Sequence, residues 1–174
     1  VSQNIINNAF IGMKAMHGSR NILILGNQFM KNELWSIGLM PGAASHAALA
    51  AADDKSKPRP ANVDGGSIIA NNIISDFGYS HAHWIWGSKG APLKFDDGQK
   101  PENPPLTDVI IQGNVIYDTG RDRVLVNGQP TVEPPRYKYA VVVSKGATGP
   151  QGLHFSNNVL HPGTSGVSNV ELKP

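Results

Sequence analysis

The sequence contains no cysteine, no long apolar run and no strong excess of one charge. The absence of cysteine excludes disulfides and thiolate metal sites, and it leaves both reducing and oxidising compartments open. Apolar runs such as residues 141–143 fall far short of the roughly 20 residues that a membrane span requires, so we expect no membrane partner. The 15 Lys and Arg are interspersed with 13 Asp and Glu, so we expect no nucleic-acid partner.

Glycine and proline are abundant: the 174 residues include 19 glycines and 13 prolines. So many turn-forming residues argue against a helical bundle and favour short strands joined by irregular connections. The apolar content of 40% is ordinary for a chain that buries a core. We therefore predict an all-β chain that forms a single domain over residues 1–174.

One short pattern recurs five times: alternating apolar residues, a gap, an asparagine, any residue and an apolar residue. The best copies are Ile22–Phe29, Ile68–Ile74, Val109–Ile116 and Leu153–Leu160, and a truncated copy includes Asn4. The asparagines lie at positions 4, 27, 72, 114 and 158, at intervals of 23, 45, 42 and 44 residues. Such self-similarity indicates a stack of repeated units, in which the first interval is one bare coil and the later ones are coils lengthened by loops.

A further strand-like segment lies between successive copies of the pattern. These segments are Ile11–Met13, Ser36–Leu39, His83–Trp86 and Tyr139–Ser144. If every coil contributes short strands with alternate side chains inward, stacking joins those side chains into one continuous core. We therefore predict a right-handed parallel β-helix of about four to five coils with long loop insertions. The repeated asparagine should lie at a sharp turn and bond the asparagines above and below it, as an asparagine ladder.

The alternative is an antiparallel sandwich in which the same asparagines mark hairpin turns. Two-residue hairpins favour Asn-Gly or Asp-Gly. None of the five asparagines is followed by glycine, because the next residue is Ile, Gln or Val. The pattern therefore favours bends within a solenoid.

The strand pairs around Asn-x-[Ile/Leu/Phe], together with residues 66–79, resemble the right-handed parallel β-helix proteins of the pectin-lyase-like superfamily, the pectate lyase and polygalacturonase related group. The resemblance covers most of the chain, which looks like the C-terminal portion of a longer solenoid. It implies a polysaccharide partner, lyase or glycoside hydrolase activity, and an extracellular or periplasmic location. The fold hosts many activities, so the resemblance is more specific for fold than for chemistry.

The polygalacturonase signatures Asn-Thr-Asp, Asp-Asp, Gly-His-Gly and Arg-Ile-Lys are not present as an intact set. The pairs Asp53-Asp54 and Asp96-Asp97 fall in expected loops, so no catalytic role is carried over to them.

Loops are expected at two corners of each coil. One corner comprises residues 40–65, 88–107 and 145–151, and the other comprises 30–34, 75–82, 117–138 and 161–166. The second corner is chemically richer. Its candidate catalytic residues are Asp76, His81, His83, Asp118, Arg121, Asp122 and Arg123. The candidate substrate-binding residues are Tyr79, Trp84, Trp86 and Tyr137.

Two reactions fit these residue types. Elimination on an acidic sugar needs a base and a cation that stabilises the enolate, for which Arg121 or Arg123 and Ca²⁺ held by aspartates are suited. Hydrolysis needs two carboxylates across the sugar bond, and Asp76 and Asp118 are the candidate pair. The alternative is that residues 118–123 only form surface salt bridges.

In one short segment His81 and His83 lie two residues apart, and so do Trp84 and Trp86. The two histidines would share one side of a strand, yet no third ligand lies close in sequence, so we predict no metal site. The two tryptophans also share a face, and they are either an exposed platform for sugar rings or bulky core residues.

A non-catalytic reading stays open beside the enzyme: a structural or binding solenoid, such as a tailspike-like or adhesion module that forms a homo-oligomer. Convergent carboxylates or bound Ca²⁺ beside an aromatic groove would favour the enzyme. Apolar surfaces that pair across a symmetry axis would favour the structural module.

Overall fold

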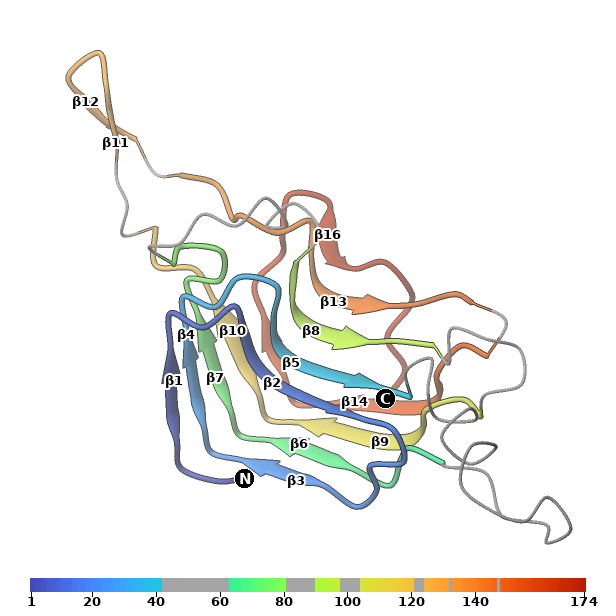
Figure 1. The fold of residues 1–174 in the computed structure, drawn as a ribbon. Helices are drawn as coiled ribbons and strands as arrows, with labels where there is room; N and C mark the ends of the chain where they lie inside the picture. Colours follow the sequence, from blue (N-terminus) through green and yellow to red (C-terminus); the bar gives the residue numbers. More distant parts are fainter. Residues whose placement is uncertain (42–62, 81–89, 98–103, 121–123, 132, 147) are drawn as a thin grey trace, which may run out of the picture.

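The structure, a computed structural model, describes residues 1–41, 63–80, 90–97, 104–120, 124–131, 133–146 and 148–174. Over these ranges the chain forms sixteen strands and no helix. Fourteen of the strands form three parallel sheets that wind around one axis (Figure 1), and the other two form an antiparallel hairpin. The predicted parallel β-helix is confirmed, and the antiparallel sandwich is wrong.

Each coil passes through sheets A, B and C in that order. Sheet A contains β3 (Leu23–Leu25), β6 (Ile68–Ala70), β9 (Thr107–Gln112) and β14 (Gln151–Ser156). Sheet B contains β1 (Ile5–Asn7), β4 (Gln28–Met30), β7 (Ile73–Ser75), β10 (Val115–Tyr117) and β15 (Val159–Leu160). Sheet C contains β2 (Ile11–Met16), β5 (Trp35–Met40), β8 (Ala91–Phe95), β13 (Tyr139–Val143) and β16 (Gly166–Ser168). The hairpin consists of β11 (Val124–Val126) and β12 (Gln129–Thr131).

The core consists of apolar rows that run along the solenoid. In sheet A, Ile24 is in register with Ile69, and Ile69 with Ile111. All three side chains are fully buried, and equivalent rows line the inner faces of sheets B and C. Because alternate strand residues face opposite sides, each coil places the same positions inward, and each later interval between asparagines is one coil, as predicted.

The corner between sheets A and B is a tight turn that is built alike in every coil. Gly26, Asn71, Gly113 and Asn157 have φ between 52° and 64°, in the left-handed region. The asparagine that follows each of them turns inward, and Asn27, Asn72 and Asn114 are fully buried. Their amides bond from coil to coil, from Asn4 to Asn158, so the predicted asparagine ladder is present.

One predicted strand was misplaced. In the third coil, sheet C is formed by β8 and not by His83–Trp86, because β8 pairs with both β5 and β13. Leu93 and Phe95 of β8 are fully buried. This strand was not recognised in the sequence because it contains Pro92, and proline is uncommon within sheets. Residues 81–89 lie outside the described part of the chain, so the orientation of Trp84 and Trp86 stays a prediction.

Candidate functional site

Asp76, a predicted catalytic residue, joins the loops of two successive coils at the corner between sheets B and C. It directly follows β7 and is buried. Its Oδ1 accepts hydrogen bonds from the backbone N–H of Thr119 at 2.8 Å and from the Thr119 hydroxyl at 2.6 Å. The carboxylate is therefore engaged in holding the next loop.

Tyr79, a predicted substrate-binding residue, is buried in the same corner. Its hydroxyl donates to the carbonyl of Pro134 at 2.8 Å, and the Arg136 guanidinium lies 4.1 Å from the centre of its ring. Arg136 also forms an ion pair with Glu133 at 2.9 Å. Tyr79 thus packs between loops, where its ring serves as a platform for a cation.

Tyr137, the other described substrate-binding candidate, is also buried, with its ring edge-on to Phe77 at 5.9 Å between centroids. Its hydroxyl donates to the carbonyl of His161 at 3.2 Å. Burial raises the pKa of the Tyr137 hydroxyl above its usual range, and the charge of Asp118 and the nearby Tyr79 raise it further. Tyr137 is therefore a neutral hydrogen-bond donor.

Asp118 is more accessible than Asp76. Its Oδ1 accepts from the backbone N–H of Gly120 at 2.9 Å. Asp118 borders a depression of about 270 Å³. The depression is also lined by Gly120, Glu133, Pro134, Pro135 and His161. This depression brings together two carboxylates and an imidazole, which are groups capable of acid–base chemistry. Glu133 and His161 were not predicted, because only folding brings them beside Asp118.

The remaining predicted site residues lie outside the described part of the chain. They are His81, His83, Trp84, Trp86, Arg121, Asp122 and Arg123. Their assigned roles stay predictions. Among the described residues, no three His, Cys, Asp or Glu side chains are grouped as metal ligands. Over the same ranges, nothing helical is long and apolar enough to span a membrane.

A second polar surface lies on the outer face of sheet C. Lys14, Gly38, Lys94 and Val142 occupy one row across four successive strands. A Cβ on Gly38 would lie 3.3 Å from the Met40 methyl group and 3.4 Å from the Trp35 ring, so these two side chains cover the outer face at the position where the row has no side chain. The Lys14 ammonium lies 5.6 Å from the centre of the Trp35 ring, within range of a cation–π interaction.

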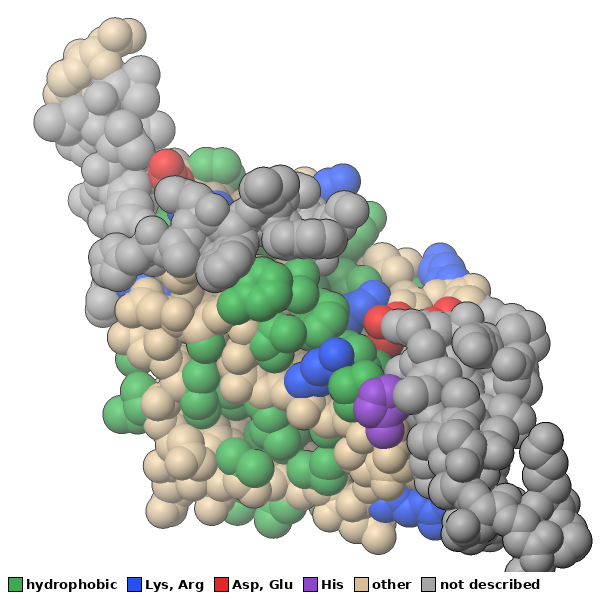
Figure 2. Space-filling model, viewed as in Figure 1, with side chains coloured by type: hydrophobic (Ala, Val, Ile, Leu, Met, Phe, Trp, Pro, Cys, Tyr) green, Lys and Arg blue, Asp and Glu red, His purple; other side chains and the backbone are tan. Residues whose placement is uncertain are grey.

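Lys94 belongs to a polar cluster at the end of this row. Its ammonium donates to the Ser144 hydroxyl at 3.0 Å and lies 3.7 Å from Asp96 Oδ1, and the Ser144 hydroxyl donates to the same carboxylate. Figure 2 shows basic, acidic and hydrophobic side chains gathered on the face that β2, β5 and β8 cross. We call Lys14, Trp35, Lys94, Asp96 and Ser144 the sheet C surface.

None of the sheet C surface was predicted as a site. The alternation of Met13, Lys14 and Ala15 was enough to place Lys14 on an outer face. Lys94 was missed because its strand was misplaced, and Ser144 and Asp96 come together only through the pairing of β8 with β13.

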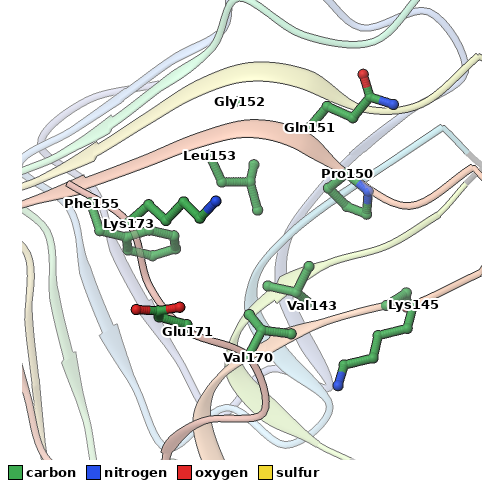
Figure 3. A pocket seen from close by; sticks show the side chains of 11 residues that line it. Val143, Lys145, Pro150, Gln151, Gly152, Leu153, Phe155, Val170, Glu171 and Lys173 are labelled. Atoms are coloured by element: carbon green, nitrogen blue, oxygen red, sulfur yellow. The ribbon is translucent and has the colours of Figure 1, made fainter.

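A further depression, of about 410 Å³, opens at the C-terminal end of the solenoid (Figure 3). Val143 of β13, Leu153 and Phe155 of β14, and Val170 form its apolar part. Figure 3 shows Lys173 running beside the Phe155 ring. The depression is a gap between the last coil and residues 170–173, and it exposes the end of the core.

Comparison with known proteins identified no relative of this chain. No protein-family model, no curated protein and no solved structure matches the chain. The parallel β-helix, the corner depression and the sheet C surface are therefore the observations on which a function can be built.

Proposed function

We propose that this chain is a carbohydrate-active protein of the pectin-lyase-like kind that binds an acidic polysaccharide along the sheet C surface. The observation that carries the proposal is the row in which Lys14 and Lys94 flank the Trp35 ring. Two strand spacings of about 4.8 Å place the two lysines about 10 Å apart along the solenoid axis.

This spacing suits a long, regularly charged chain. A polysaccharide laid along the axis presents carboxylates at regular intervals, and each ammonium forms a charge-assisted hydrogen bond with a carboxylate. An indole face between the two cations stacks against a sugar ring, because its apolar surface matches the C–H face of the ring. The net charge of +2 also favours an anionic partner over a cationic one.

Cleavage is assigned to the corner between sheets B and C. Asp118 and Glu133 supply two carboxylates beside His161 for hydrolysis. For elimination, Arg121 and Arg123 and a Ca²⁺ bound through aspartates are the groups that the sequence offers. The Asp76 carboxylate supports this corner by holding Thr119.

Binding and cleavage are tested together with the native protein and a panel of polysaccharides. We expect polyuronates to bind and neutral glucans not to bind, with affinity falling as salt rises because the contacts are ionic. Equal binding to neutral and acidic chains would refute the proposal. Unsaturated sugar ends together with new reducing ends identify a lyase, and reducing ends alone identify a hydrolase.

A structural module is the second candidate, favoured by exposed apolar rows on the other two sheets. Leu23, Ile68 and Ile110 form a row on sheet A and are 46%, 38% and 41% exposed. Ile73 and Val159 are exposed on sheet B. If these rows form a subunit interface, the protein sediments as an oligomer that Ile68→Lys and Ile110→Lys dissociate, and no polysaccharide binds.

A further inference from the structure

The two lysines of the sheet C surface have different partners. Lys14 is exposed, and its ammonium lies over the Trp35 ring and pairs with no carboxylate of the described residues. The ammonium of Lys94 lies 3.7 Å from Asp96 Oδ1 and donates to the Ser144 hydroxyl, and the side chains of Lys94 and Asp96 are only 17% and 18% exposed. The surface therefore offers one unpaired cation and one cation whose charge is balanced by a carboxylate.

The backbone of sheet C holds Asp96 and Ser144 in place. The two residues directly follow β8 and β13. The N–H of Asp96 donates to the carbonyl of Leu39 at 3.0 Å, and the N–H of Ser144 donates to the carbonyl of Phe95 at 2.9 Å. Because residues two apart in a strand face the same side, Asp96 lies on the same outer face as Lys94. The pairing of Lys94 with Asp96 is therefore fixed by the sheet.

One oxygen of Asp96 is available to a ligand. Oδ1 accepts a hydrogen bond from the Ser144 hydroxyl and another, at 3.1 Å, from the N–H of Asp97. Oδ2 accepts no hydrogen bond from the residues that the structure describes. The Lys94 ammonium has three N–H donors, and Ser144 takes one of them. Hydrogen-bond donors and an acceptor therefore lie side by side, on the face where Figure 2 shows acidic beside basic side chains.

Such a pair suits hydroxyl groups better than a carboxylate. A sugar hydroxyl can accept a hydrogen bond from Lys94 or donate one to Asp96, whereas a carboxylate can only accept. A ligand carboxylate at Lys94 would also face the negative charge of Asp96, and like charges repel more strongly where water is partly excluded. At Lys14 the ligand carboxylate meets an unpaired cation.

We propose that Asp96 sets the charge pattern of the ligand. The sugar at Lys14 carries a carboxylate, and the sugar at Lys94 is uncharged and bonds both Lys94 and Asp96 through neighbouring hydroxyl groups. Lys14 and Lys94 lie about 10 Å apart along the solenoid axis, so they contact different sugars of one chain. The inference rests on the proposed function, and it narrows the ligand to an acidic polysaccharide that also contains uncharged sugars. A fully charged polyuronate binds more weakly, since one of its carboxylates meets Asp96.

The test compares two samples of one polyuronate by calorimetry: a fully charged sample and a sample in which half of the carboxyl groups are reduced to alcohols. The native protein should bind the partly reduced sample more tightly. Asp96→Asn removes the charge and keeps an oxygen acceptor for Ser144. In this variant the fully charged sample should bind at least about fivefold more tightly than it binds the native protein, and the preference should be lost.

Two further variants separate the local charge from other effects. Asp108→Asn makes the same charge change at an exposed position of β9, where the φ of 53° also suits asparagine. Ser144→Ala removes the hydroxyl between Lys94 and Asp96 and leaves both charges. Both variants should keep the native preference.

Two results would overturn the inference and leave the proposed function intact. One is an unchanged ratio of the two affinities in Asp96→Asn, and the other is loss of the preference in Asp108→Asn or Ser144→Ala as well. If the native protein bound neither sample, the proposed function would be refuted, and this inference with it.

Discussion

The corner between sheets A and B and the corner between sheets B and C belong to the same coils, yet they are built on opposite principles. The first is a tight turn with a left-handed residue followed by an inward asparagine in every coil. The second differs in length in every coil: it consists of residues 31–34 in one coil and of residues 118–138 in another. A uniform corner lets bonds repeat along the axis and holds the fold. A variable corner leaves room for side chains that act on a partner.

The difference follows from burial. A buried amide must have its donors and acceptors bonded, and the ladder meets that demand only if each coil supplies an asparagine at the same position. The longer corner is held by individual contacts, such as Asp76 with Thr119 and Tyr79 with Pro134. Each such contact can change without affecting every other coil.

The largest effect on stability is expected from removing a ladder asparagine at the uniform corner. Asn72→Ala removes the acceptor of Asn27 and the donor to Asn114, and it leaves several buried polar groups unbonded. At roughly 1–3 kcal/mol for each unpaired group, we expect a loss of about 4 kcal/mol in the free energy of unfolding. Denaturant unfolding measures it. The control is Asn71→Gly, an exposed position with a φ of 54°, which should change stability by less than about 0.5 kcal/mol. Equal losses in the two variants would contradict the ladder's role.

A smaller effect is expected at the variable corner. Asp76→Ala removes the acceptor of both Thr119 donors, and we expect a loss of about 2 kcal/mol. Asp76→Asn keeps an oxygen acceptor and should lose less. Hydrogen exchange should quicken around Thr119 and stay unchanged in the ladder. A loss in Asp76→Ala as large as that of Asn72→Ala would erase the distinction between the two corners.

The third corner, between sheets C and A, offers a pH test with a smaller effect. Burial raises the pKa of Asp64 above its ordinary value of 3.8, although hydrogen bonds from the N–H groups of Gly18 and Ser19 and the charges of His17 and Arg20 oppose the shift. The folded state therefore holds the proton more tightly than the unfolded state. Relative to Asp64→Asn, the native protein should lose stability as pH rises from about 3.8 through the raised pKa. A parallel pH dependence of the two proteins would contradict the shift.

The uniform corner was also easier to predict from the sequence than the variable corner. The ladder and the strands beside it were predictable, because the pattern is local and repeats five times. The strand β8 was not, since proline at position 92 is uncommon within sheets and only pairing with β5 and β13 identifies the strand. Of the predicted site, Asp76, Tyr79, Asp118 and Tyr137 do lie at one corner, but three of the four are buried. Burial at that corner depends on loops from several coils, which no local pattern reveals.

The sheet C surface tests the assignment of function most directly. Polyuronate binding is measured by calorimetry for the native protein, for the double variant Lys14→Ala/Lys94→Ala, and for Lys173→Ala, which removes one charge at the C-terminal end. We expect the double variant to bind at least tenfold more weakly, a difference of about 1.4 kcal/mol or more, with its thermal stability nearly unchanged. Lys173→Ala should bind like the native protein. Native affinity in the double variant would contradict the assignment of polysaccharide binding to sheet C.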